Sequence, residues 1–229
     1  MARRCRQPAG GSITILRLDG DVDVTRTSGT DRLGNVAGVL LAAGSGSRLG
    51  RPKALVRLGS SLLVERGQAM LSSAGCEPVV VVLGAAAEEV RAVADLDGAQ
   101  VLVNPDWATG MGSSLRVALA ALGPSVPAAV VALVDQPLVG PAAVRRLVAA
   151  WRDGALAAVA TYGGAPRNPV LLDRSTWPEV SRTAVGDVGA RPFLRDHPDL
   201  VRRVACDDTG FPDDLDTEED RMRLEERCS

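Results

Sequence analysis

Short apolar runs alternate with amphipathic stretches between residues 36 and 151. The apolar runs predict buried strands at 36–42, 78–83, 100–103 and 128–134. The amphipathic stretches predict helices at 62–74, 86–96, 113–122 and 141–151, the first stopped by Gly75 and the last opened by a proline. This repeated strand–helix order predicts a parallel sheet with right-handed crossovers and helices on its faces.

Three polar segments follow predicted strands at the edge of the sheet where such folds bind ligands, beyond the carboxyl ends of the strands. Residues 43–50 are rich in glycine and follow the first strand, residues 104–115 follow the third, and Asp135 follows the fourth. We therefore expect these segments to line one binding site.

The glycine-rich segment leads to Lys53, the only lysine among 26 lysine and arginine residues. Glycines let backbone N–H groups approach an anion, and an ammonium is a compact charge suited to phosphate. The segment is not a dinucleotide fingerprint, because Leu49 stands at the third glycine, nor a P-loop, because Lys53 follows Pro52. It predicts a phosphate loop of another type, with an ordinary strand-to-helix turn as the alternative.

Asp135 and residues 110–114 each fit two interpretations. An aspartate at the end of a buried strand suits Mg²⁺, which prefers carboxylate oxygens, and it equally suits the turn before a helix. Residues 110–114, Gly-Met-Gly-Ser-Ser, cap the next helix or offer its N-terminus and two hydroxyls to an anion. For the second segment capping is the simpler interpretation.

Composition narrows the class of function. With 229 residues, 46% of them apolar, the chain can bury one substantial α/β core. A formal net charge of −2 argues against a nucleic-acid partner, and no apolar stretch is as long as a membrane span, so we expect small-molecule partners in the cytoplasm. The four cysteines are scattered and indicate neither a zinc site nor a disulfide framework. The single histidine, His197, does not indicate a Ser-His-Asp hydrolase.

Residues 1–35 differ from the rest of the chain. They are rich in Arg, Asp, Thr and Gly and contain one short apolar stretch at 13–18. We expect a mostly disordered extension with that stretch as a stray strand, followed by a single domain over residues 36–229.

Five ordered motifs resemble the MobA-like nucleotidyltransferase family and, within it, the molybdenum cofactor cytidylyltransferases. They are Leu-Ala-Ala-Gly-Ser-Gly-Ser-Arg-Leu-Gly at 41–50 with Pro-Lys-Ala-Leu at 52–55, Asn-Pro-Asp-Trp at 104–107 with Gly-Met-Gly-Ser-Ser-Leu at 110–115, Leu-Val-Asp-Gln-Pro-Leu at 133–138, Gly-Asp-Val-Gly-Ala-Arg at 186–191, and Asp-Leu-Asp-Thr-Glu-Glu-Asp at 214–220. The resemblance implies a three-layer α/β/α fold with a mostly parallel, Rossmann-like sheet of the nucleotide-diphospho-sugar transferase type.

The resemblance also implies an activity: transfer of a nucleoside monophosphate to the terminal phosphate of molybdopterin or molybdenum cofactor, with release of pyrophosphate. Cytidylyl members resemble this chain in having Leu-Ala-Ala-Gly at the first turn, whereas guanylyl members usually have Leu-Ala-Gly-Gly, so Ala43 favours CTP over GTP. A molybdenum-dependent dehydrogenase is compatible with this activity as a protein partner.

Site roles follow residue by residue from the family pattern. It assigns nucleotide binding to Leu41, Ala42, Ala43, Gly44, Ser45, Gly46 and Lys53, catalysis to Arg48, Lys53 and Asp135, and acceptor binding to Met111, Ser113, Ser114, Asn168 and Arg191. It assigns Mg²⁺, the expected cofactor, to Asp135 and an acid of the 214–216 run, for which we choose Asp216 over Asp214. Mg²⁺ and fixed cations would offset the repulsion between two phosphate groups. Without the resemblance, the acidic run would only complement a helix dipole and Arg191 would be a surface residue.

The chain departs from the family pattern in three places. Val134 stands where glycine commonly precedes the metal-binding aspartate, Arg-Asn-Pro-Val at 167–170 replaces Gly-His-Pro-Val in the expected acceptor region, and Glu218 replaces a proline.

Two other classes of function stay open for this chain. It could be an NAD(P)H-dependent reductase of a heterocycle on the same scaffold, or a non-catalytic molybdenum cofactor-binding chaperone.

Overall fold

A seven-stranded sheet forms the centre of the protein. The structure is a computed structural model that describes residues 11–18, 21–28 and 34–228. The strand order is β11-β9-β10-β8-β3-β6-β7. The strands are β3 (Ala37–Ala42), β6 (Val79–Leu83), β7 (Ala99–Val103), β8 (Ala128–Leu133), β9 (Ala157–Tyr162), β10 (Ala165–Asp173) and β11 (Val201–Ala205).

The half of the sheet that carries the glycine-rich loop is parallel. β3 pairs in parallel with both β6 and β8, and β6 pairs in parallel with β7. In the other half, β10 runs antiparallel to β8 and β9, and β11 is parallel to β9. The sheet is therefore mostly parallel, and the carboxyl ends of β3, β7 and β8 meet at one edge.

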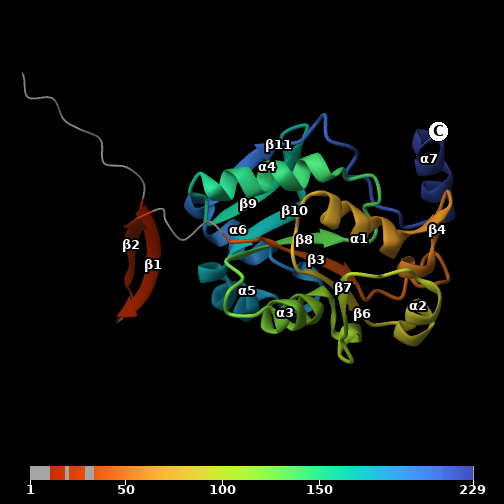
Figure 1. Ribbon diagram of the computed structural model, residues 1–229, viewed down its shortest axis with the longest axis horizontal. Helices are drawn as coiled ribbons and strands as arrows, with labels where there is room; N and C mark the ends of the chain where they lie inside the picture. Colours follow the sequence, from red (N-terminus) through yellow and green to blue (C-terminus); the bar gives the residue numbers. More distant parts are fainter. Residues whose placement is uncertain (1–10, 19–20, 29–33, 229) are drawn as a thin grey trace, which may run out of the picture.

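Helices cover both faces of the sheet in three layers (Figure 1). They are α1 (Leu63–Ser73), α2 (Ala87–Val93), α3 (Met111–Ala121), α4 (Pro141–Arg152), α5 (Trp177–Thr183), α6 (Arg191–Asp196) and α7 (Glu218–Cys228). Buried residues of α1, α2, α4 and α7 belong to the core on one face, and those of α3, α5 and α6 to the core on the other.

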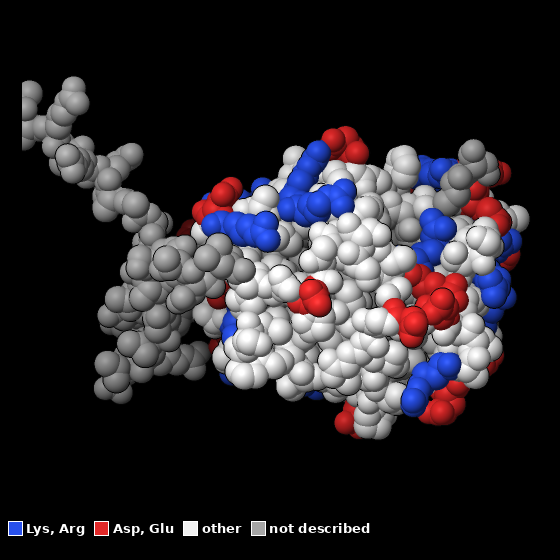
Figure 2. Space-filling model, viewed as in Figure 1, with Lys and Arg blue, Asp and Glu red and all other residues white. Residues whose placement is uncertain are grey.

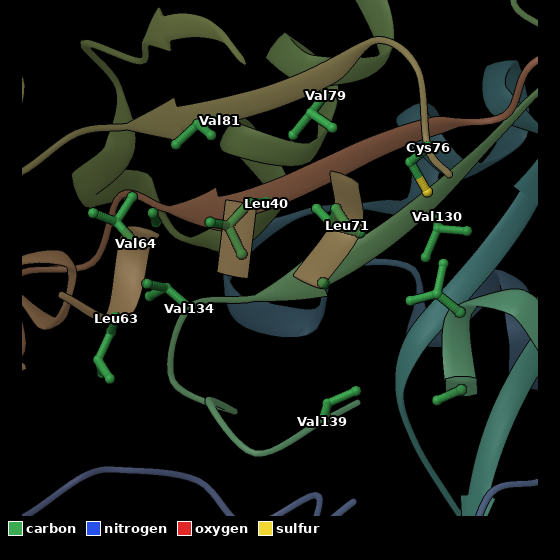
Figure 3. Close-up of a cluster of buried hydrophobic side chains, with 14 of the residues drawn as sticks. Leu40, Leu63, Val64, Leu71, Cys76, Val79, Val81, Val130, Val134 and Val139 are labelled. Carbon is green, nitrogen blue, oxygen red and sulfur yellow. The ribbon is translucent and has the colours of Figure 1, made fainter. Parts of the chain in front are cut away.

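Strand pleating explains how the two cores share the same strands. Successive residues of a strand point to opposite faces, so Leu40 faces the first core and Val39 the second. Figure 3 shows Leu40 of β3 between Val64 and Leu71 of α1 in the first core. Because both faces are buried, the parallel strands are continuous apolar runs rather than alternating ones.

Two small antiparallel pairs lie outside the main sheet. β1 (Gly11–Leu18) pairs with β2 (Asp21–Ser28), and β4 (Arg57–Leu58) pairs with β5 (Ser61–Leu62). The sequence indicated one stray strand at 13–18, where the structure has a pair of strands. The rest of the expected extension, residues 1–10, 19–20 and 29–33, lies outside the described residues, so its disorder stays a prediction.

The predicted fold class is confirmed, and each of the eight predicted strands and helices is present between residues 36 and 152. Their ends lie within three residues of the predicted ends, and several coincide with them. α2 ends at Val93 rather than at 96, because Glu65 of α1 accepts a hydrogen bond from the Asp95 amide at 3.0 Å and fixes an extended connection. Among the described residues, no helix is long and apolar enough to span a membrane.

Charged side chains of both signs are interspersed over the face of the molecule seen in Figure 2. Wide uncharged areas separate them. This distribution fits the formal net charge of −2 and contains no broad basic surface of the kind that binds nucleic acid on the face shown.

Candidate functional site

The glycine-rich loop leaves the end of β3 and folds back before Lys53. Gly46 has a φ of +62°, and a Cβ at this position would lie 2.1 Å from the carbonyl oxygen of Arg51. Only glycine fits such a close approach with this backbone conformation. The turn therefore delivers Lys53, the first residue of a 3-10 helix at Lys53–Leu55, to the carboxyl edge of the sheet.

Lys53 lies between two carboxylates that are distant in the sequence. Its Nζ donates to Asp135 Oδ2 at 2.7 Å and to Asp216 Oδ1 at 2.6 Å. Arg48 Nη1 contacts the other oxygen of Asp216 at 2.9 Å. The side chains of Lys53 and Asp135 are 15% and 23% exposed, that of Asp216 is 35% exposed and that of Arg48 is 73% exposed. Exposure to solvent therefore increases outward from Lys53.

Backbone contacts explain why Asp216 reaches Asp135. Leu215 is fully buried, and its amide donates to the carbonyl oxygen of Asp135 at 2.7 Å. The amides of Asp216 and Thr217 then donate to Asp220 Oδ2, which fixes the turn into α7. Asp135 follows β8, which ends at Leu133, and the segment that carries Asp216 is packed directly on Asp135.

The charges in this cluster shift one another's protonation. Burial lowers the pKa of Lys53, but the carboxylates of Asp135 and Asp216 outweigh it, so that the pKa lies above its ordinary value. Burial raises the pKa of Asp214, and Asp135 and Asp216 raise it further, against a hydrogen bond from Gln136 that lowers it. Lys53 is therefore charged at neutral pH, and the carboxyl group of Asp214 ionises less readily than an ordinary aspartate.

The first pocket, of about 370 Å³, opens above the glycine-rich loop. Its lining comes from the ends of β3 and β8, the loop after β7 and the start of α3: Leu41, Ala43, Gly44, Ser45, Ser47, Lys53, Trp107, Ala108, Gly110, Met111, Ser114, Leu133, Val134, Asp135 and Asp187. All three segments predicted to share one edge of the sheet contribute to it.

The second pocket, of about 630 Å³, adjoins the first, and Met111, Leu133 and Asp135 line both. Its remaining lining comes from the loop after β8, from β9, β10, β11 and α6, and from the 214–216 segment: Gln136, Val159, Pro166, Arg167, Asn168, Val170, Arg191, Leu194, Arg195, Val201, Arg203 and Asp214. Asp135 thus stands where two pockets meet, which suits a reaction between two bound molecules.

The start of α3 is held by a buried asparagine. Asn104 is 1% exposed, and its Nδ2 donates to the hydroxyls of Ser113 at 2.8 Å and Ser114 at 2.9 Å. Asp187 accepts from the amide of Met111 at 3.2 Å. These contacts fix the wall of the first pocket and leave Ser113 buried behind it.

The structure distributes the predicted site residues unevenly between the two pockets. Leu41, Ala43, Gly44, Ser45 and Lys53 line the first pocket, whereas Ala42 lies in the core and Gly46 supports the loop from outside the lining. Of the residues predicted for the acceptor, Asn168 and Arg191 line the second pocket, Met111 lines both, and Ser114 lines the first. Ser113 lines neither pocket, and its hydroxyl donates to the carbonyl oxygen of Gly110 at 2.8 Å. The residue before α3, Gly110, makes no side-chain cap, so the structure does not have the side-chain capping expected of this segment.

Sequence reasoning did not assign a role to several residues that line the pockets. Trp107 and Asp187 belong to recognised motifs but were given no position in the site. Gln136 follows Asp135 directly, and its Nε2 donates to Asp214 at 2.8 Å. Arg203 is on a strand without any motif, so nothing in the local sequence marked it.

Comparisons with known proteins show the family of the chain. Residues 38–201 match the MobA-like NTP transferase domain. The nicotine blue oxidoreductase of Paenarthrobacter nicotinovorans is 42% identical over 196 residues, which cover 82% of this chain and 96% of that protein. The probable molybdenum cofactor guanylyltransferase of Opitutus terrae is 39% identical over 87 residues, which cover 38% of this chain and 42% of that protein.

A solved structure extends the comparison. The Rv0371c protein of Mycobacterium tuberculosis H37Rv, crystallised as a complex with manganese, is 33% identical and has a TM-score of 0.73, with coverage of 84% of this chain and 99% of that one. The mostly parallel sheet and the loop at its edge are those of a nucleotidyltransferase-type enzyme. The chain belongs to the MobA-like NTP transferase family.

Proposed function

We propose that the protein transfers a nucleoside monophosphate, CMP from CTP, to the terminal phosphate of a molybdopterin-type acceptor and releases pyrophosphate. The observation that carries the proposal is the position of Lys53 and Asp135. Lys53 Nζ lies 2.7 Å from Asp135 Oδ2, and Asp135 lines both pockets. One pocket would hold the nucleotide and the other the acceptor, so that the α-phosphate and the attacking oxygen meet beside these residues.

The chemistry needs positive charge more than it needs a nucleophilic side chain. The acceptor supplies its own phosphate oxygen, and the barrier comes from bringing two anions together. Lys53 and Arg48 would stabilise the phosphates of the nucleotide and the departing pyrophosphate, while the loop amides orient them. The walls built by Asn104 and Asp187 keep the nucleotide in one position, which lowers the entropic cost of the reaction.

The residues present also suit a divalent cation. Asp135 and Asp216 converge on one point, since both contact the same Nζ, and the second oxygen of Asp135 is buried without a hydrogen-bond partner among the described residues. Carboxylate oxygens are the ligands that Mg²⁺ prefers. When bound, Mg²⁺ would offset the charge of the triphosphate. No cluster of three or more acidic, cysteine or histidine side chains that could hold a metal occurs in the described part of the chain, so the phosphates would supply other ligands.

Manganese in the complex of the 33% identical Rv0371c protein supports a divalent ion in this family. For the base, Ala43 lines the first pocket and is packed near Gly84 and Trp107. Its methyl group takes space that a glycine would leave, which favours the smaller cytosine over guanine. The product would pass to a molybdenum-dependent enzyme such as a dehydrogenase.

Pyrophosphate release with CTP, Mg²⁺ and molybdopterin tests the proposal directly, with GTP measured side by side. We expect transfer with CTP, a slower rate with GTP, and losses of about 100-fold or more for Asp135→Asn and Asp216→Asn. Because both would act through one ion, the double variant should be scarcely worse than the poorer single variant. Asp213→Asn is a matched control, since Asp213 pairs with Arg227 at 2.7 Å and lines neither pocket.

A second candidate function is reduction of a heterocycle by NAD(P)H. The 42% identity to nicotine blue oxidoreductase over most of both chains favours it. The same two pockets would then hold the dinucleotide and the heterocycle. Oxidation of NAD(P)H in the presence of an oxidised heterocycle, without pyrophosphate release from CTP, would establish this function in place of transfer.

A further inference from the structure

One wall of the second pocket carries positive charge that the described residues do not neutralise. Arg167 of β10, Arg191 and Arg195 of α6, and Arg203 of β11 line this pocket. Arg195 pairs with Asp196 at 2.8 Å. The guanidinium groups of the other three have no hydrogen-bond or ion-pair partner within the part of the chain that the structure describes.

Several other arginines of the protein are paired with carboxylates. Arg146 makes two hydrogen bonds to Asp208, Arg182 two to Glu179, and Arg221 contacts both Glu218 and Glu225. Like charges in one pocket repel each other unless an anion lies between them. Three unpaired arginines from three separate elements in one pocket therefore differ from the ordinary charged surface of this chain.

Strand register places Arg203 far from Asp135 but on the face of the sheet that α6 covers. Arg203 is paired with Val159, Val159 with Val170, and Val170 with Val131 of β8. The three valines all belong to the core on the face covered by α6, and Val201, two residues before Arg203, packs there too. From β8, which leads to Asp135, to the edge strand β11 is three strand spacings, about 14 Å in all.

The second pocket thus has a reactive end, an apolar floor and a basic end. Asp135 marks the first, Val159, Val170 and Leu194 contribute to the floor, and Arg203 with Arg191 marks the last. Guanidinium groups bind oxyanions through paired hydrogen bonds, which makes arginine the residue suited to a phosphate or carboxylate group.

We propose that Arg203 and Arg191, with Arg167 beside them, form an oxyanion-binding position at the basic end of the second pocket, which takes a phosphate or carboxylate group. The inference does not rest on the proposed function, because the reacting phosphate of the acceptor would lie at the other end of the pocket, beside Asp135. It makes Arg203 a binding residue for that oxyanion group.

Calorimetric titration of the full chain with inorganic phosphate tests the basic end without needing the acceptor. A CTP analogue with a methylene bridge between the α- and β-phosphates is kept saturating, so that the first pocket is occupied. Arg203→Gln and Arg191→Gln are compared with the parent and with Arg202→Gln. Arg202 is the matched control, because it lies on the same strand but contacts the carbonyl oxygen of Ala150 and the carboxylate of Asp153 on α4's side.

We expect phosphate to bind the parent and Arg202→Gln alike, and at least about 5-fold more weakly to Arg203→Gln and Arg191→Gln, the loss of a charge-assisted hydrogen bond. Equal binding by Arg203→Gln and Arg202→Gln, or no binding by the parent, overturns the inference. Absence of pyrophosphate release alongside a phosphate affinity that depends on Arg203 would reject the proposed transfer and leave the oxyanion site standing.

Discussion

A single ammonium group balances two carboxylates at the centre of the site. Because Lys53 Nζ contacts both Asp135 and Asp216, a divalent cation that used the same oxygens would compete with it. Removal of the ammonium in Lys53→Met should therefore tighten Mn²⁺ binding in the absence of nucleotide, by about tenfold or more. The same change should slow transfer by about 100-fold, because the phosphates lose a fixed cation. Electron paramagnetic resonance of free Mn²⁺ and pyrophosphate release measure the two effects.

Arg51→Met is the control for this prediction. Arg51 lies in the same loop and pairs with Glu218 at 3.7 Å, outside both pockets, so its loss should change neither quantity. Unchanged Mn²⁺ affinity in Lys53→Met would show that the ion binds elsewhere.

The sequence alone could single out Lys53 and Asp135, because a lone lysine and an acid that follows a strand are local signals. It could not show that Lys53 bonds to both acids, since that contact depends on how Leu215 packs.

At the scale of elements, the close contact between α3 and the segment before α6 shapes the first pocket. A Cβ on Gly112 would lie 2.3 Å from the carbonyl oxygen of Ala184, a backbone atom that cannot move alone. Gly112→Ala should therefore lower the free energy of unfolding by about 1–3 kcal/mol, and it should raise the KM for nucleotide, because Met111 and Asp187 move with the contact. Urea unfolding and steady-state kinetics measure both. Gly123→Ala, with nothing within 4 Å of the added Cβ, should change stability by less than about 0.5 kcal/mol, and a similar result for Gly112→Ala would contradict the close packing.

Local patterns predicted the first half of the sheet and little of the second. β3, β6 and β8 are continuous apolar runs because both faces are buried, and such runs are recognisable in the sequence. β11 has the pattern of an edge strand, Val-Arg-Arg-Val-Ala, in which two of five residues are arginine, so it resembles a surface segment. β10 begins with exposed residues and becomes buried only from Pro169 onward, so its antiparallel pairing with β8 and β9 was visible only in the folded sheet. The acceptor side of the site was correspondingly less predictable than the loop side.

Across the whole molecule, the main sheet and both pockets are built from residues after Gly34. Asn35 donates to Glu77 at 3.0 Å, Val36 is 3% exposed in the core, and β1 and β2 pair with each other rather than with the main sheet. A chain that begins at Asn35 should keep its fold and its rate of transfer, and its free energy of unfolding should change by less than about 0.5 kcal/mol. A chain that begins at Ala43 lacks β3, the strand between β8 and β6, and should not fold, since two neighbours lose their pairing and both cores lose buried side chains. Circular dichroism measures the fold of the two truncated chains, urea unfolding measures their stability, and pyrophosphate release measures their rate of transfer. Loss of solubility or of transfer in the chain that begins at Asn35 would mean that residues 1–34 contribute contacts on which the domain depends.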